Sequence, residues 1–164
     1  LAANTKGNTL VLFSRVESHG LKIFNLIKER TEKPVYFIFG GTETSIREEV
    51  RKEVEAAEDA IIVASSQIFS TGINIRSLAN IIFSYPSKSR VRTLQSIGRV
   101  LRVSSKKVIA KIFDISDNLT WKGKPNYTYK HFAERLKIYT EEDFEYSIKE
   151  IQLENLYATS IPEL

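Results

Sequence analysis

Thr9-Leu10-Val11-Leu12-Phe13 is a short run of apolar residues, and it predicts a buried strand. Val35 to Phe39 is a second run of the same kind, and Gly40-Gly41 closes it. Three further apolar runs follow at residues 60–64, 80–83 and 108–113. Segments with helical patterns separate the runs, and strands that alternate with helices at this spacing favour βαβ units. The sequence therefore predicts an α/β fold with a mainly parallel central sheet.

The segments between and after these runs predict helices, loops and one more strand. We expect helices at about residues 16–30, 45–57, 89–101 and 131–139. Ser45 and Glu48 have the spacing of a capping box at the start of the second helix. The apolar alternation from Phe144 to Leu153 predicts a last edge strand. Residues 65–74 and 114–127 are expected to be loops. Trp121 in the second loop is expected to anchor it to the core, with stacking on a base as the alternative.

Composition places limits on the class of protein. The 164 residues suffice for one domain with a core, and 42% hydrophobic with 27% charged residues is typical of a soluble globular protein. No apolar run is long enough to span a membrane, and no signal peptide is present, so a membrane partner is not expected. The chain has no cysteine and two histidines, which fits a cytoplasmic protein and argues against a disulfide framework or a histidine-rich metal site. Because it begins at Leu1 and has no methionine, we expect it to be part of a longer protein.

Charge is distributed unevenly along the chain. The segment from Ala60 to Phe113 has no acidic residue and nine basic ones, although the net charge of the whole chain is only +4. The simpler interpretation is that buried strands avoid carboxylates, but the basic residues lie between the predicted strands and not inside them. We therefore favour a surface for polyanions, either a nucleic-acid backbone or a triphosphate.

The predicted helix at residues 89–101 combines an apolar face with a basic face. At 100° per residue, Arg92, Gln95, Arg99 and Arg102 lie within a sector of about 80°, opposite Leu94, Ile97 and Leu101. A guanidinium group stays charged at neutral pH and matches phosphate oxygens two at a time. This helix is therefore either a phosphate clamp or an amphipathic surface helix with solvated arginines.

Two motifs resemble a known family. Residues Ser65 to Ile75, followed by Gln95-x-x-Gly98-Arg99-x-x-Arg102, resemble motifs V and VI of superfamily 2 helicases. Leu10 to Gly20 is similar to motif IV, so the resemblance extends from Thr9 to Phe113. Within the superfamily, the chain is most similar to the UvsW-type recombination helicases of phages.

The resemblance implies the second, C-terminal of two RecA-like motor domains, a three-layer α/β/α unit spanning residues 1–153 with a tail at 154–164. In this family ATP lies between the two domains, and the first domain supplies the phosphate loop and the acidic pair that holds Mg²⁺. This chain has neither motif, so we expect it not to hydrolyse ATP alone. Its N-terminal motor domain would be its partner within the same protein.

Individual residues match the motifs. Arg102 corresponds to the arginine finger, Arg99 to a second arginine that reaches the γ-phosphate, and Gln95 to a polar residue at the interdomain site. Gly72 and Asn74 match the ATP-contacting glycine and aspartate of motif V, although asparagine replaces the usual aspartate. The positions expected to approach nucleic acid are Ser14, Arg15, Gly41, Thr42, Ser66 and Gln67. For the serines, a cap or turn role alone is an equal alternative.

The function implied is that of an ATP-dependent DNA helicase that acts on single-stranded or branched DNA, including RNA–DNA hybrids, in recombination and repair. The surroundings would be the cytoplasm of a phage-infected bacterium. Two alternatives remain: a double-strand DNA translocase of the restriction or remodelling type, and a non-catalytic nucleic-acid-binding module.

Overall fold

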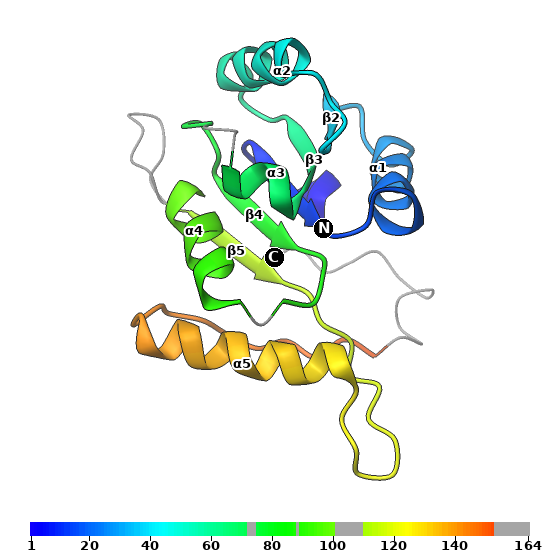
Figure 1. Cartoon of the computed structure of the whole chain (residues 1–164), viewed down its shortest axis with the longest axis vertical. Coiled ribbons are helices and arrows are strands. Elements are labelled where there is room, and N and C mark those ends of the chain that lie inside the picture. Colours follow the sequence, from blue (N-terminus) through cyan, green and yellow to red (C-terminus); the bar gives the residue numbers. More distant parts are fainter. Residues whose placement is uncertain (72–74, 88, 101–109, 153–164) are drawn as a thin grey trace.

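The computed structural model of the chain describes residues 1–71, 75–87, 89–100 and 110–152. Within these residues, five parallel strands form one sheet in the order β2-β3-β1-β4-β5 (Figure 1). The strands are β1 (Thr9–Phe13), β2 (Val35–Ile38), β3 (Ile61–Ser65), β4 (Asn80–Phe83) and β5 (Lys111–Asp114). The expected parallel α/β fold is confirmed.

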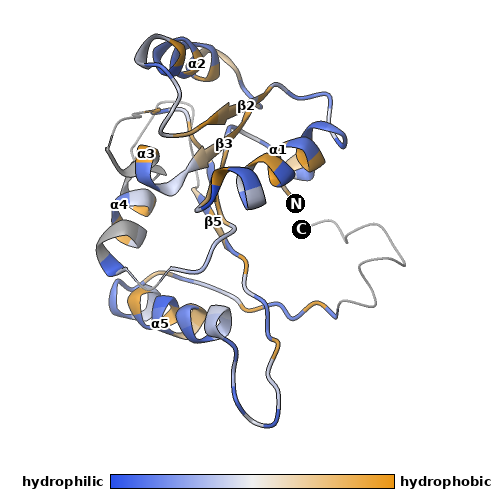
Figure 2. Cartoon of the chain, turned by 45° about the vertical axis from the view of Figure 1, so that its right-hand side comes forward, coloured by the Kyte–Doolittle hydropathy of each residue, from blue (hydrophilic) through white to orange (hydrophobic). Residues whose placement is uncertain are grey.

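Helices cover both faces of the sheet and make three layers (Figures 1 and 2). One face packs against the π-helical turn η2 (Val16–Gly20) and helix α1 (Leu21–Lys28), with a short turn η1 (Ala2–Asn4) at its margin. The other packs against α2 (Thr44–Ala56), α3 (Ser66–Thr71), α4 (Arg90–Val100) and α5 (Tyr127–Glu141). The sheet is therefore covered by a larger and a smaller helical layer.

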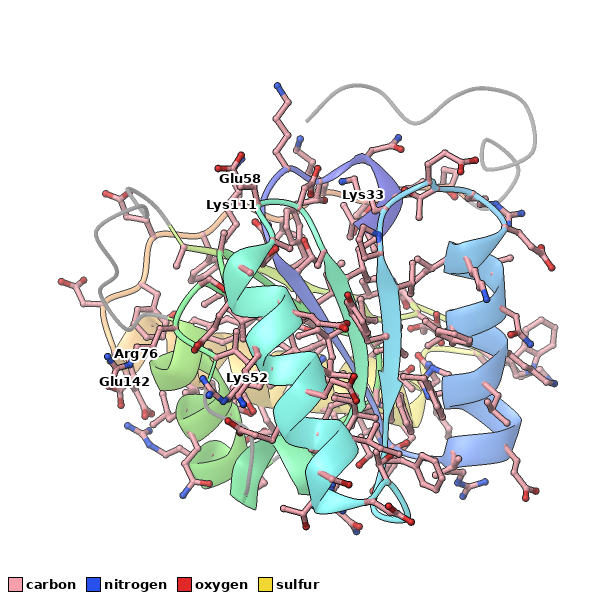
Figure 3. The ribbon with its side chains drawn as sticks, turned by 90° about the horizontal axis from the view of Figure 1, so that it is seen from above. Lys33, Lys52, Glu58, Arg76, Lys111 and Glu142 are labelled. Carbon is pink, nitrogen blue, oxygen red and sulfur yellow. The ribbon has the colours of Figure 1, made fainter. Side chains whose placement is uncertain are left out.

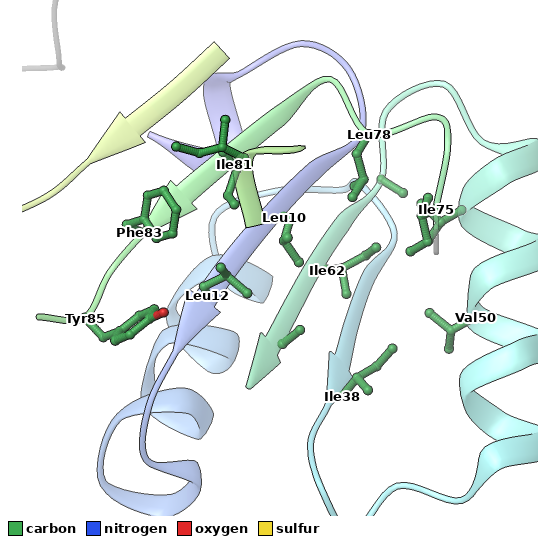
Figure 4. Close-up of a cluster of buried hydrophobic side chains, with 14 of the residues drawn as sticks. Leu10, Leu12, Ile38, Val50, Ile62, Ile75, Leu78, Ile81, Phe83 and Tyr85 are labelled. Carbon is green, nitrogen blue, oxygen red and sulfur yellow. The ribbon is translucent and has the colours of Figure 1, made fainter. Parts of the chain in front are cut away.

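Alternation along the strands divides the core between these layers. In β1, Leu10 and Leu12 join the cluster beneath α2 and α4, whereas Val11 and Phe13 join the cluster beneath α1. Figure 4 shows the first cluster, where residues from β1, β3 and β4 meet Val50 of α2. Every residue of β1 is buried, as expected for the middle strand of a parallel sheet.

The smaller layer approaches the sheet closely at one glycine. The rings of Phe13 and Phe37 stack with centroids 5.2 Å apart. A Cβ atom at Gly20 would lie 2.6 Å from the ring of Phe13, so a side chain at this position would push η2 away from β1. Glycine is thus required at position 20, because η2 packs directly against the Phe13 ring of β1.

Several expectations about local structure are wrong. The helix expected at about residues 45–57 is confirmed as α2, but the Ser45–Glu48 capping box is wrong, because Glu43 is the N-cap and no side chain makes a capping hydrogen bond. Residues 66–71 form α3 and not a loop. Residues 144–152 form no strand; Phe144 and Tyr146 instead lie with their rings 6.4 and 6.3 Å from that of Tyr139 in α5. Their apolar alternation therefore reflects packing on a helix.

Asn8, immediately before β1, ties several elements together and is 2% exposed. Its amide nitrogen lies 2.8 and 2.9 Å from the carbonyl oxygens of Val54 and Ala57 at the end of α2, and 2.9 Å from the hydroxyl of Ser77. Its amide oxygen accepts a hydrogen bond from the N–H of Ala60, at 2.8 Å, where β3 begins. One side chain thus satisfies backbone groups that lie about 50 residues away in the chain.

The substitution Asn8→Ala should lower the free energy of unfolding by about 3 kcal/mol, because it leaves buried backbone groups without partners, each at about 1–3 kcal/mol. Urea unfolding followed by circular dichroism measures this loss. Asn25→Ala, at an exposed position of α1, is the control and should change stability by no more than about 0.5 kcal/mol. Equal stability of the two variants would show that the Asn8 interactions contribute nothing.

Candidate functional site

The carboxyl ends of the strands share one edge of the sheet, because the strands pair in register. Phe13, the last residue of β1, lies opposite Ser65, the last residue of β3, and Phe83 of β4 lies opposite Asp114 of β5. The segments that follow β1, β2, β3 and β4 therefore begin at this edge. They contain most of the residues predicted to bind ATP or nucleic acid.

Ser14 and Arg15 follow β1, and both are exposed. Arg15 has an extended backbone and is the N-cap of η2; its carbonyl accepts a hydrogen bond from the N–H of Gly20 at 2.8 Å. Its guanidinium has no ion-pair partner among the described residues. Both side chains are therefore available to a ligand at the carboxyl edge.

Gly41 and Thr42 form a tight turn after β2. The N–H of Phe39 donates to the hydroxyl oxygen of Thr42, and the N–H of Thr42 donates to the carbonyl oxygen of Phe39, both at 3.0 Å. A Cβ atom at Gly41 would lie 2.6 Å from the Phe39 ring. The hydroxyl oxygen of Thr42 is engaged in this turn, but its proton remains free to donate to a ligand.

At the end of β3, two serines are buried beside an exposed glutamine. Ser66 begins α3 and is 7% exposed, whereas Gln67 is exposed. Ser65 is equally buried, and its hydroxyl has no hydrogen-bond partner among the described residues. Ser65 was not among the predicted site residues, and its unpartnered hydroxyl at the carboxyl end of β3 is the signal that singles it out.

Helix α4 carries the motif with the glutamine and the arginines. It buries Thr93, Ser96 and Ile97, which are each no more than 2% exposed, and presents Gln95 and Gly98 to solvent. The predicted burial of Ile97 is confirmed, whereas Leu94, expected on the same apolar face, is only partly buried. Arg99 lies in the last turn of the helix, and its side chain is outside the described part of the structure, as are Gly72, Asn74, Leu101 and Arg102 as a whole. The exposed Gln95 fixes which face of α4 is turned away from the core.

Helix α5 holds the start of α4 in place, which the sequence did not reveal. Arg90, the first residue of α4, forms ion pairs with Glu141 and with Glu142, the latter at 2.5 Å. Arg135 of α5 donates to the carbonyl oxygen of Ser87 at 2.8 Å, in the segment between β4 and α4. Arg90 belongs to the segment without acidic residues, and its own charge is already balanced by these two glutamates.

The partner of Arg135 is Asp114, the last residue of β5. Its carboxylate accepts two hydrogen bonds of 2.6 Å from the guanidinium and one of 2.8 Å from the Tyr139 hydroxyl. Arg135 is 1% exposed and the Asp114 side chain 8%. This buried triad joins the end of β5 to α5.

Burial and the nearby charges shift the proton affinities of these groups. Burial raises the pKa of Tyr139, and the Asp114 carboxylate raises it further. Burial alone lowers the pKa of Arg135, but its hydrogen bonds and attraction to Asp114 leave that pKa above the ordinary value. The hydrogen bond from Arg90 to Glu141 raises the pKa of Arg90. All three groups therefore keep one protonation state around neutral pH and act as fixed structural elements.

The opposite, amino edge of the sheet has a different character. Lys33, Glu58 and Lys111 lie along this edge (Figure 3). Lys33 is engaged there: its ammonium group donates to the Thr5 carbonyl at 2.7 Å and pairs with Asp59 at 3.0 Å. Basic and acidic groups are mixed at the amino edge, so it offers a poorer surface for a polyanion.

The donor set of the site suits phosphate oxygens better than a metal ion. Hydroxyl, amide and guanidinium groups gather at the carboxyl edge, and all of them can donate hydrogen bonds. Among the described residues, no group of three or more histidine, aspartate or glutamate side chains is arranged to hold a metal. None of the described helices combines the length and the apolar character needed to cross a bilayer.

A parallel sheet between helical layers, with an arginine-bearing helix after its fourth strand, is the arrangement found in RecA-like motor domains. The chain belongs to the helicase conserved C-terminal domain family, whose model matches residues 1–104. It is similar to the ATP-dependent DNA helicase UvsW of Enterobacteria phage T4, with 37% identity over 156 residues. That match covers 89% of this chain and 31% of the phage protein, so the chain spans about a third of its relative.

Other proteins are similar to this chain in sequence or in fold. A putative ATP-dependent RNA helicase of Methanocaldococcus jannaschii is 27% identical over 111 residues, which are 65% of this chain and 14% of that protein. The solved C-terminal domain of the DEAD-box protein Dbp5 matches with a TM-score of 0.62 and 15% identity over 87% of this chain and 74% of that one. The DNA-bound restriction-modification enzyme LlaBIII matches with a TM-score of 0.56 and 21% identity, over 80% of this chain and 10% of that one.

Asp114→Ala should lower the free energy of unfolding by about 3–5 kcal/mol, because it leaves the Arg135 charge buried and unpaired. Adding Arg135→Met should recover part of this loss, since the uncompensated charge is then gone. Lys137→Ala, which removes an exposed pair with Glu134, is the control and should cost about 0.5 kcal/mol or less. Chemical denaturation of the four proteins decides the matter. A loss below 1 kcal/mol for Asp114→Ala would contradict a structural role of the triad.

Proposed function

We propose that this chain is the C-terminal motor domain of an ATP-dependent DNA helicase that acts on single-stranded or branched DNA. The observation that carries the proposal is the position of α4. Its Thr93, Ser96 and Ile97 face the core, which leaves the Gln95 face of the helix directed outward. The resemblance to a phage DNA helicase over 89% of the chain supports the choice of DNA.

The arginines of motif VI would act on ATP bound between this domain and an N-terminal partner domain. Helical periodicity puts Arg99 on the same side of α4 as Gln95, and Arg102 follows three residues later. Guanidinium groups held in this way stabilise the charge that spreads over the transferred phosphoryl group. Gln95 would position the γ-phosphate, and Gly72 and Asn74 would contact the nucleotide. Mg²⁺ would be held by the partner domain.

The loops at the carboxyl edge would hold the DNA backbone. Ser14, Arg15 and Gln67 are exposed, and Thr42 has a hydroxyl proton to donate. Gly41 and Ser66 are the other expected contacts: Gly41 leaves room for the Phe39 ring beside the turn, and Ser66, which is 7% exposed, begins α3 beside Gln67. Such groups bind phosphate and sugar without regard to sequence, so binding should be strongly dependent on salt.

Motion along DNA would come from ATP binding to both domains at once. A ligand can shift an equilibrium between two arrangements only as far as it binds one better than the other. ATP that contacts Arg99 and Arg102 as well as the partner domain favours the closed arrangement, and hydrolysis removes that preference. The DNA contacts of the two domains would then be made and released in turn.

In the complete protein, Arg102→Ala should lower DNA-stimulated ATP hydrolysis by about 10³-fold or more, the effect typical of an arginine finger. Arg102→Lys should also be defective, because lysine keeps the charge but not the two-pronged geometry. Arg30→Ala removes an exposed arginine after α1 and serves as the control. Steady-state phosphate release measures all three. Activity of Arg102→Ala within a few-fold of the wild type would refute the assignment.

The 164-residue chain alone should bind single-stranded DNA weakly and should not hydrolyse ATP. Affinity should fall steeply between 50 and 200 mM salt, since backbone contacts release counterions. Fluorescence anisotropy of a labelled oligonucleotide and a phosphate-release assay give the two readouts. Robust DNA-stimulated hydrolysis by this chain would mean that it holds its own phosphate and metal site, contrary to the proposal.

A further inference from the structure

The segment between β5 and α5 is a hairpin that extends away from the body of the protein (Figures 1 and 2). At its tip, the backbone groups of Trp121 and Lys124 exchange hydrogen bonds of 3.1 and 2.9 Å. Trp121 is 74% exposed, so the expectation that it anchors the loop to the core is wrong. Its indole ring is therefore accessible to a ligand at the tip of the hairpin.

The hairpin is fixed at both of its ends. It starts at Asp114, which the buried pair with Arg135 holds in place. It ends at Asn126, whose amide oxygen accepts from the N–H of Leu119 at 3.0 Å and whose amide nitrogen donates to the carbonyl of Asp117 at 3.1 Å. The tip is therefore presented on a supported stem, which limits the entropy lost when a ligand binds.

The turn at the tip contains a residue that its backbone geometry does not favour. Lys122 and Gly123 have φ angles of 48° and 74°, both in the left-handed region. Glycine adopts this geometry freely and asparagine readily, but a lysine there is less favourable. Lysine at position 122 therefore makes the turn less stable than glycine or asparagine would, and what it contributes is its positive charge.

The charged side chains at the tip itself are basic, whereas Asp117 lies in the stem of the hairpin. From Asn118 to Ala133 the chain has three lysines, at positions 122, 124 and 130, and no acidic residue. The ammonium group of Lys122 lies 6.0 Å from the centre of the Trp121 ring. Tyr127, at the start of α5, is another exposed aromatic residue, at 66%. Exposed aromatic rings between lysines suit a strand with both bases and phosphates.

We propose that the tip, residues Trp121 to Lys124, is a second nucleic-acid contact, where an unpaired base stacks on Trp121 and Lys122 and Lys124 meet the adjoining phosphates. This inference rests on the proposed function, because the strand that reaches the tip is the DNA strand bound by the carboxyl-edge loops. It adds a different kind of contact, because the carboxyl-edge loops would hold only the backbone. Only an unpaired base exposes a face for stacking, so the tip would favour single strands over duplex.

Trp121 is the only tryptophan of the chain, so its fluorescence reports directly on this site. An oligothymidylate of about 20 nucleotides should quench the emission, whereas an abasic oligomer of equal length and a blunt duplex should quench it far less. Anisotropy of the labelled oligomers, measured in the same titrations, gives the total affinity. Equal quenching by the abasic oligomer would overturn the proposal, because it would mean that no base is in contact with the ring.

Variants separate stacking from a structural role of the hairpin. Trp121→Ala should weaken binding of the oligothymidylate about tenfold, and Trp121→Phe should keep most of the affinity. Leu119→Ala, which removes another exposed apolar side chain of the hairpin, is the control and should bind as the wild type does. Lys122→Asn should weaken binding and lower the salt dependence by about one counterion, while leaving thermal stability equal or higher.

The outcomes distinguish the two proposals. If Trp121→Ala binds within twofold of the wild type and the oligothymidylate does not quench, this inference fails while the proposed function stands. If the chain binds no nucleic acid at any salt concentration, both fail. If Lys122→Asn lowers thermal stability and leaves the affinity unchanged, the lysine has only a structural role and the tip is not a phosphate contact.

Discussion

The in-register pairing of the parallel strands around β1 is the constraint on which the rest of the structure depends. Because β1 pairs with β3 on one side and β4 on the other, every residue in it is buried and must be apolar or satisfied internally. The same pairing brings the ends of the strands together at one edge. Asn8 fixes where this arrangement starts, since it binds α2 and β3 at the point where β1 begins. A site assembled from several loops follows from this geometry.

Apolar runs predicted all five strands because a buried parallel strand has a nearly continuous apolar sequence. Helix α3 was missed, since its residues are those that also favour turns, and only the packing of Ile68 against the core distinguishes the two. The expected edge strand failed for a related reason. Alternating apolar residues fit a strand, but Phe144 and Tyr146 pack against Tyr139 of α5, and no local pattern specifies that. Tertiary contacts decided both segments.

Spacing within single motifs predicted the residues of the candidate site. The same spacing did not predict the residues that hold these residues in place. Arg90 pairs with residues about 50 positions away, and Asp114 with Arg135, which is 21 positions away. Pairs at such separations leave no periodic signature, whereas the arginines of α4 repeat at helical spacing. The support is nevertheless specific: Glu141 and Glu142 pair with Arg90, the first residue of α4, and Arg135 of α5 donates to the carbonyl oxygen of Ser87 just before that helix. Helix α5 therefore belongs to the apparatus that sets the orientation of the arginine-bearing helix.

The excess of basic residues between Ala60 and Phe113 overstates the number available to a polyanion. Glu141 and Glu142 balance the charge of Arg90, and Lys111, which begins β5, lies at the amino edge, away from the carboxyl-edge loops. Conversely, Lys122 and Lys124 lie outside this segment, yet they stand at an exposed hairpin tip, and no acidic residue occurs between Asn118 and Ala133. The position of a basic residue in the sequence therefore does not show whether that residue is available to a polyanion. What decides the function of each is whether the fold gives it a partner within the chain or directs it toward solvent beside other donors.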